Sequence, residues 1–268
     1  LANLQRLAVT GKLSALSFTD TNTSLQFSAA QINTSSALLS KAVASGVTVK
    51  VADTAVNTSR MASRISTAYE VTVTDTAANI QKNLAGLQTL AASGKLDTLT
   101  FTDSSEPIVM KASQFGNTAA LRALMPDATI NVVDTAANVA KTNVAGASHV
   151  TVKDTAANVL RNLDAMRTLA STAPSMDVTL TERAPVMLLT AAQYIGSADL
   201  RDKLQNVTYT IKGTASEIAD NADQLSGLKA IVTDTAAQLQ NNLEALQGLA
   251  DARLLTLKVT DAKTAKLE

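Results

Sequence analysis

The sequence predicts an α/β fold in which stacked βα units form an open right-handed solenoid, with a parallel sheet on one side and helices on the other. Three observations predict it: short strand-like segments recur, a helical pattern follows most of them, and the strand segments alternate apolar with polar residues. The clearest repeat is VTVTDTAANI at 71–80, which returns as VTVKDTAANV at 150–159 and AIVTDTAAQL at 230–239. Such recurrence is typical of units that bury their apolar face only by stacking on a neighbour.

The strand-like segments set the period of the repeat. Asp75, Asp154 and Asp234 end equivalent segments and lie 79 and 80 residues apart, so three unequal βα units make one super-repeat. We expect one continuous repeat domain over 1–268, with super-repeats at 1–75, 76–154, 155–234 and 235–266, the first and last being partial, and a cloning scar at 267–268. The segments end at Asp20, Asp53, Asp75, Asp103, Asp134, Asp154, Glu182, Gly213, Asp234 and Asp261.

Alternation within the strand segments favours a solenoid over a doubly wound sheet. In the segment that ends at Asp75, Val71 and Val73 are apolar while Thr72 and Thr74 are polar. A period of two means one buried and one wet face, whereas a sheet covered on both faces has nearly continuous apolar strands. If right-handed crossovers all place their helices on one side, the chain advances as an open coil. The predicted solenoid is similar to leucine-rich repeats in shape only.

The helix after each DTAA segment is predicted by a stripe of apolar residues. Ile80, Leu84, Leu87 and Leu90 are spaced by 4, 3 and 3 residues, which places them on one face of a helix. Asp or Thr of DTAAN is a good N-cap. We call the turn from a strand to the following helix a corner, and we expect the Asn side chains to hydrogen-bond neighbouring corners to each other. The predicted corner and cap residues are Asp75, Asp103, Asp134, Asp154, Asp234, Asn79, Asn138 and Asn158.

The second unit of each super-repeat carries an insertion. SSEPIVMKASQF begins at Ser104, RAPVMLLTAAQY at Arg183 and NTSLQFSAAQI at Asn22. Turn residues followed by a short apolar segment predict a hairpin-like return before the next helix. Ser28–Gln31 and Thr190–Gln193 have the form of a capping box.

The polar face of the predicted sheet is the best candidate for recognition. A flat array of Thr at strand spacing suggests binding of ice, a glycan or another sheet, although Lys residues interrupt it and Thr is also an ordinary residue for a solvated strand; the Thr/Lys face suggests a glycan or a partner protein. The candidate binding residues are Thr72, Thr74, Thr100, Thr102, Thr151, Lys153, Thr179, Thr181, Thr210 and Lys212.

Composition argues against several classes of function. Lys plus Arg equals Asp plus Glu at 23 each, so there is no basic surface for nucleic acid, and no apolar stretch is long enough for membrane insertion. Cysteine is absent, and His149 is the only histidine, so neither a His-rich metal site nor a Ser-His-Asp triad is expected. No phosphate loop or dinucleotide-binding motif occurs. We expect no enzyme and no cofactor.

Calcium is the one metal that the sequence raises. The row of terminal Asp residues offers hard oxygen ligands. Capping and corner hydrogen bonds explain the same position in every unit without an ion, and the glycine-rich nonapeptide of calcium-binding repeats does not occur. The sequence therefore favours structural corners and no bound metal.

The segment VTVTDTAANIQKNLAGLQTLAASGKLDTLTFTD, followed by an AAQ segment and a second DTAAN, resembles repeat tracts of large proteobacterial haemolysin-type (RTX) calcium-binding, type I-secreted proteins. The resemblance covers nearly the whole chain. It implies a secreted, extracellular or cell-surface protein of adhesin, surface-layer or matrix type.

Three functions follow as expectations. The first is a non-catalytic structural or adhesive repeat segment that acts as a spacer or scaffold at the bacterial cell surface. The alternatives are a module that recognises a glycan or a cell-surface protein through its Thr/Lys face, and an accessory repeat of a secreted RTX enzyme or toxin. Open strands at Leu16–Asp20 and Leu257–Asp261 predict self-association through the ends of the solenoid.

Overall fold

The computed structural model describes residues 2–19, 24–103, 106–173 and 175–261. The chain divides into two compact units, the first comprising Leu1–Val133 with Val144–Ser148 and the second Asp134–Asn143 with His149–Glu268. Both have an α/β architecture with helices between parallel strands, which confirms that part of the predicted fold class. Asp20, Ser104, the Asn22 start of the first insertion and the expected scar at 267–268 lie outside the described residues.

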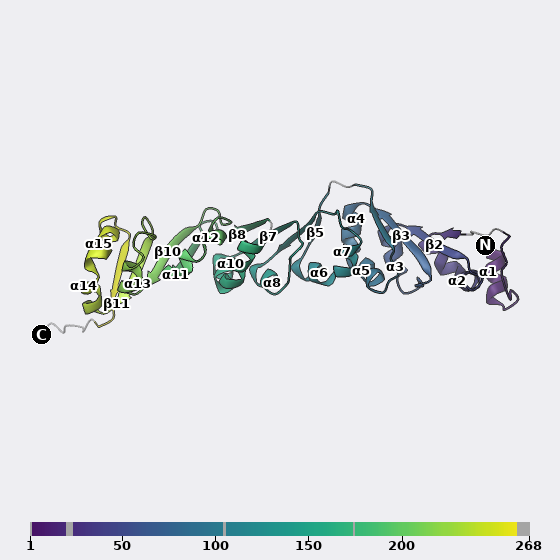
Figure 1. The fold of residues 1–268 in the computed structure, drawn as a ribbon, viewed down its shortest axis with the longest axis horizontal. Coiled ribbons are helices and arrows are strands. Elements are labelled where there is room, and N and C mark those ends of the chain that lie inside the picture. Colours follow the sequence, from purple (N-terminus) through teal and green to yellow (C-terminus); the bar gives the residue numbers. More distant parts are fainter. Residues whose placement is uncertain (1, 20–23, 104–105, 174, 262–268) are drawn as a thin grey trace. The chain divides into compact units, whose positions relative to one another are not determined.

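The first unit contains a four-stranded parallel sheet in the order β1-β2-β3-β4, and a separate parallel pair, β5 with β6. In Figure 1, helices α2, α3 and α5 lie along the same side of the β1–β4 sheet. Its elements are α1 (Ala2–Val9), β1 (Ser24–Phe27), α2 (Ala29–Ala44), β2 (Thr48–Asp53), α3 (Ala55–Arg60), β3 (Tyr69–Asp75), α4 (Ala77–Lys82), α5 (Leu84–Ala92), β4 (Thr98–Phe101), β5 (Ile108–Met110), α6 (Ala112–Asn117), α7 (Ala119–Ala123) and β6 (Ile130–Asp134).

The second unit contains a four-stranded parallel sheet in the order β12-β11-β10-β9, and a parallel pair, β7 with β8. Its elements are α8 (Ala136–Ala140), β7 (His149–Asp154), α9 (Ala156–Arg161), α10 (Leu163–Thr172), β8 (Met176–Leu180), β9 (Val186–Thr190), α11 (Ala191–Ile195), α12 (Ala198–Arg201), β10 (Thr208–Gly213), α13 (Ala215–Ala219), β11 (Lys229–Asp234), α14 (Ala236–Asn241), α15 (Leu243–Asp251) and β12 (Leu255–Val259).

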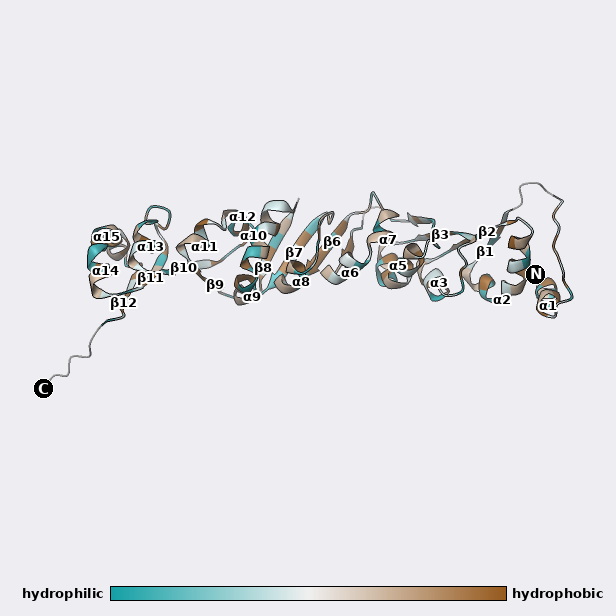
Figure 2. Cartoon of the chain, turned by 60° about the horizontal axis from the view of Figure 1, so that its bottom comes forward, coloured by the Kyte–Doolittle hydropathy of each residue, from teal (hydrophilic) through white to brown (hydrophobic). Residues whose placement is uncertain are grey.

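The cores follow the alternation of the sequence. In β3, Val71 and Val73 are 0% exposed, and Leu87 and Leu90 of α5 are likewise 0% exposed. Thr74 is exposed and Thr72 half-buried. Apolar residues, shown in brown in Figure 2, run along the strands. One sheet face is therefore buried beneath helices, as a period of two requires.

The insertions form strands of their own, and the predicted hairpin-like return is wrong. β5 pairs in parallel with β6 instead of folding back on β4, and β9 pairs in parallel with β10 instead of β8. Pro107 and Pro185 stand just before these strands, where the missing N–H of proline is tolerated. Each insertion therefore starts a new sheet, and the expectation of one uninterrupted parallel sheet is also wrong.

Two further elements differ from expectation. Leu16–Thr19 forms no strand, and Ser24–Phe27 pairs with β2 instead. The predicted helix over Ile80–Leu90 is broken at Asn83, whose φ of −114° and ψ of 14° are not helical and whose side-chain amide donates to the Asn79 carbonyl at 2.8 Å. A local side-chain bond of this kind competes with the helical backbone bonds.

Candidate functional site: corner carboxylates and outer sheet face

The terminal acid of a strand segment joins two neighbouring βα units. Asp75 Oδ2 accepts the N–H of Ala55, the first residue of helix α3 in the preceding βα unit, at 2.9 Å. Asp103 accepts from Ala77, the first residue of α4, at 2.6 Å. The first four N–H groups of a helix have no partner within it, so these carboxylates satisfy donors that stacking buries. The same link joins Asp53 to Ala29, Asp154 to Ala136, Glu182 to Ala156, Asp234 to Ala215 and Asp261 to Ala236.

The other carboxylate oxygen organises its own corner. Asp75 Oδ1 accepts from the Thr76 N–H at 2.8 Å and from the Asn79 amide at 2.7 Å. Asn138 and Asn158 donate in the same way to Asp134 and Asp154 at 2.8 and 2.6 Å. The expectation that these Asn side chains tie neighbouring corners together is wrong, because they bond within one corner and the acid makes the link.

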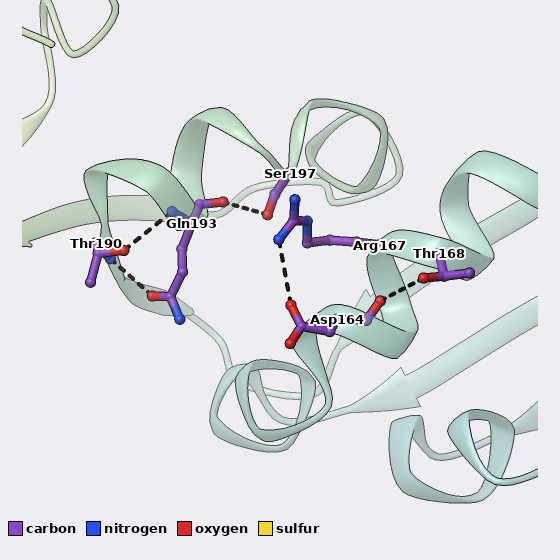
Figure 3. Close-up of polar contacts among 6 residues, drawn as sticks. All are labelled: Asp164, Arg167, Thr168, Thr190, Gln193 and Ser197. Carbon is purple, nitrogen blue, oxygen red and sulfur yellow. Dashed lines mark hydrogen bonds and ion pairs between the residues drawn. The ribbon is translucent and has the colours of Figure 1, made fainter.

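Threonine caps the helices that follow these corners. Thr76, Thr135, Thr155 and Thr235 each accept the N–H of the third helical residue through their hydroxyl. Figure 3 shows the capping box of α11, in which Thr190 accepts from the Gln193 N–H at 3.2 Å while Gln193 Oε1 accepts from the Thr190 N–H at 3.0 Å. Helix starts and links between units therefore depend on adjacent but different residues.

Hydrogen bonds outweigh burial at three of the corner acids. Burial is the largest single influence on the pKa of Asp75 and acts to raise it, but the bonds from the Asn79 amide and two backbone N–H groups together lower the pKa below its ordinary value. The pKa values of Asp53 and Asp154 are lowered against burial in the same way. These acids therefore contribute to stability in their ionised form.

One corner in the second unit lacks the acid. Gly213 stands at the end of β10, where the other strand segments end in Asp or Glu, so no side chain there links to Ala191, the first residue of α11. Glu217 instead accepts from the Thr214 N–H at 2.9 Å, which completes a local capping box. This corner keeps its helix start without the link to the preceding unit.

Eight of the ten predicted binding residues lie in strands, on the outer face of the sheets, and Thr102 and Thr181 directly follow β4 and β8. All ten are exposed or half-buried, while their neighbours Val73, Val152 and Ile211 are 0% exposed. Thr72 lies beside Thr98 and Thr74 beside Thr100 in the first unit, and Lys153 lies beside Thr179 in the second. Lys50 and Glu70 form an ion pair of 3.2 Å on the same side. The outer face is thus a mixed polar surface.

His149 lies between two groups that the sequence analysis did not connect with it. Its Nδ1 is 2.7 Å from Ser175 Oγ, and its Nε2 is 3.2 Å from Asp177 Oδ2. The expectation that a single histidine rules out such a triad is therefore wrong as a matter of geometry. Acyl transfer also needs a substrate cleft and oxyanion donors. The adjoining pocket is lined by Asp177 but by neither Ser175 nor His149. The Asp177 side chain is also 63% exposed to solvent.

Two pockets at equivalent places in the repeat differ in chemistry. The pocket between β4 and the turn that precedes β6 has a volume of about 160 Å³ and an apolar wall that includes Leu124 and Pro126. The pocket between β8 and the turn that precedes β10 measures about 320 Å³ and presents Lys203 and Gln205, 79 residues further along. Equivalent places in the repeat therefore do not offer one common ligand site.

Aromatic stacking is a feature that sequence reasoning missed. The Arg122 guanidinium lies 3.8 Å from the Phe115 ring centre, and burial lowers its pKa. Arg201 stacks on Tyr194 at 4.0 Å. The two pairs are 79 residues apart, and an aromatic followed seven residues later by Arg is a signal that the repeat alignment makes visible.

Within the described ranges, no three His, Cys, Asp or Glu side chains gather as ligands for a metal. None of the helices described is long and apolar enough to span a bilayer. No protein-family model matches the chain, and no curated protein or solved structure matches it either. Function must therefore be argued from the corners, the outer face and the pockets themselves.

Proposed function

We propose that this chain is a non-catalytic structural repeat segment, a spacer or scaffold in a large secreted bacterial cell-surface protein. One observation carries the proposal: the feature that recurs is the carboxylate that links one βα unit to the preceding one, as at Asp75, Asp154 and Asp234, with the Gly213 corner as the exception. The equivalent pockets, by contrast, change from apolar to polar. A repeat that keeps the hydrogen bonds between its βα units, but not the chemistry of its pockets, fits the role of a spacer.

Secretion and a place at the cell surface rest on the likeness of the DTAAN segments to RTX repeat tracts. The same proposal includes an open right-handed solenoid, since parallel strands joined by helices favour that path. The breaks at β5 and β9 would then divide its sheet into blocks.

The outer face provides the main test of the spacer role. A variant with Glu at six outer-face threonines is compared with the unmodified chain on a glycan array and on bacterial cells, after circular dichroism shows that both are folded. A control variant carries six Glu residues on exposed helix positions. The outer-face set is Thr72, Thr74, Thr100, Thr102, Thr179 and Thr181, and the control set is Ala85, Thr89, Ala92, Thr168, Ser171 and Thr172.

A spacer gives no specific binding by any of the three proteins. Binding that the outer-face variant loses and the control variant keeps would replace the proposal with recognition of a glycan or a surface protein by the Thr/Lys face.

The geometry at His149 calls for a separate activity test. We expect the unmodified chain and Ser175→Ala to hydrolyse an activated ester such as p-nitrophenyl acetate at the same background rate, because Ser175 is exposed and neither it nor His149 lines the adjoining pocket. A rate that Ser175→Ala and His149→Ala both abolish would contradict the non-catalytic role.

A further inference from the structure

The motif Asn-x-Ser/Thr, in which x is any residue but proline, occurs three times within the described residues, at Asn33–Ser35, Asn57–Ser59 and Asn206–Thr208. A fourth copy begins at Asn22, outside the described residues. The asparagine of this motif is the acceptor of N-linked sugars, which are carried on exposed loops. The motif is short and arises often by chance, so the structure must show which copy presents its side chains to an enzyme.

Two of the three copies lie inside helices. Residues i and i+2 of a helix do not face each other, so the amide and the hydroxyl of the motif point to different sides. In α2, Ser35 is only 5% exposed. In α3, the Asn57 amide donates to Asp53 Oδ1 at 2.8 Å. Ser59 Oγ donates to the Asn83 carbonyl at 3.5 Å. Both copies must therefore unfold locally before an enzyme can hold the amide and the hydroxyl together.

The third copy lies in the segment between α12 and β10, which follow each other in Figure 1. Asn206 and Thr208 are both exposed, and Val207 between them is half-buried. The φ of Asn206 is 58°, a left-handed conformation that asparagine tolerates better than most residues. No described residue forms a hydrogen bond with its side-chain amide. Both groups of this motif are therefore accessible without unfolding.

The equivalent turn of the first unit lacks the acceptor. Asp127 stands 79 residues before Asn206, and Thr129 takes the place of Thr208. A carboxylate has no amide nitrogen to carry an N-linked sugar, so only the turn of the second unit completes the motif. Asn206 also lines the pocket of about 320 Å³ beside β8. A sugar attached there has open space next to it.

We propose that Asn206 is a glycosylation site whose substrate is a sugar activated by a diphosphate at its anomeric carbon. A glycosyltransferase catalyses the step. The amide nitrogen of Asn206 forms a bond to the anomeric carbon, the bond from that carbon to the diphosphate oxygen breaks, and the diphosphate leaves with the electron pair. The amide proton passes to a carboxylate base of the transferase. This goes beyond the spacer role and does not depend on what the outer sheet face binds.

The test is mass spectrometry of the folded chain after incubation with a transferase that acts on Asn-x-Ser/Thr. One arm supplies UDP-glucose with a soluble N-glycosyltransferase. The other supplies a polyprenyl-diphosphate oligosaccharide with an oligosaccharyltransferase, so the two arms distinguish a nucleotide donor from a lipid donor. All chains carry Asn22→Gln, which removes the fourth motif. In at least one arm we expect Asn206 to gain the sugar, and Asn206→Gln and Thr208→Ala to lose this modification.

Thr208→Ser is the matched variant, since all three described motifs then end in serine. Peptides spanning 29–37, 53–61 and 202–210 give the rate of each motif outside the fold. Relative to these peptides, we expect Asn206 of the folded variant to react about tenfold or more faster than Asn33 and Asn57, because those two helices must open first. Equal relative rates at the three asparagines would overturn the proposal. So would a folded chain that stays unmodified at Asn206 in both arms while the 202–210 peptide is modified.

Discussion

At the Asp75 corner of the first unit, one carboxylate accepts hydrogen bonds from its own corner and from Ala55 of the preceding βα unit. At the Gly213 corner of the second unit, Glu217 supplies only the local part of this arrangement. Both corners nevertheless start a helix, because Thr76 and Thr214 each cap the third helical N–H. This difference shows that starting the helix of a βα unit and linking that unit to the preceding one depend on different side chains.

Acid should have the largest effect, since it acts on three corner carboxylates together. The folded pKa values of Asp53, Asp75 and Asp154 are lowered, so the stability they contribute is present above their unfolded pKa of about 3.9 and is lost as the pH falls towards the folded values. We expect the urea midpoint to be flat from pH 7 to 5 and to fall below about pH 4. A midpoint that stays constant down to pH 3 would contradict this role.

Removing one carboxylate link between βα units should have the next largest effect. Asp75→Ala leaves the Ala55 N–H, on a residue that is 0% exposed, without its acceptor, and we expect a loss of about 2–3 kcal/mol in the free energy of unfolding. Glu70→Ala is the control, because it removes the same charge from an exposed ion pair and should cost less than about 0.5 kcal/mol. Equal losses in the two variants would show that charge, and not the link, is responsible.

Removing a cap should cost less than removing a carboxylate link. Thr76 accepts the Asn79 N–H at 3.2 Å, whereas Thr54 at the start of α3 makes no side-chain cap bond. We expect Thr76→Ala to lower the free energy of unfolding by about 1 kcal/mol and Thr54→Ala by clearly less. Urea unfolding of both variants measures the difference. A larger loss for Thr54→Ala would show that the hydroxyl bond is not the source of the effect.

Restoring the carboxylate link that is missing at Gly213 should give a small gain in the free energy of unfolding. Gly213→Asp combined with Glu217→Asn rebuilds the Asp-Thr-Ala-x-Asn arrangement, and we expect a gain of about 0.5–1 kcal/mol from a bond to the Ala191 N–H. Gly213→Asp alone is the control, because its Cβ would lie 2.9 Å from Glu217 Oε2 and the two carboxylates would repel. No gain from the double variant would mean that the corner cannot accept the link.

Much of the fold followed from the sequence because repetition shows the same physical choice several times. The strands at Val71–Asp75 and Val150–Asp154, the buried stripe of Leu84, Leu87 and Leu90, and the outward threonines all follow from local periodicity. The insertions were misjudged because a short apolar segment such as Ile108–Met110 has no local signal for its partner. Whether it pairs with the strand before or after it depends on packing.

The sequence by itself determined the period, most of the strands, the helix caps and the face on which the strand side chains lie, since these depend on neighbours a few residues apart. Only the tertiary structure decided that the terminal acids link adjacent units, that β5 and β9 start new sheets, and that Ser175, His149 and Asp177 meet. These features join residues about 20 or more positions apart through contacts that stacking creates, and local pattern carries no record of such contacts.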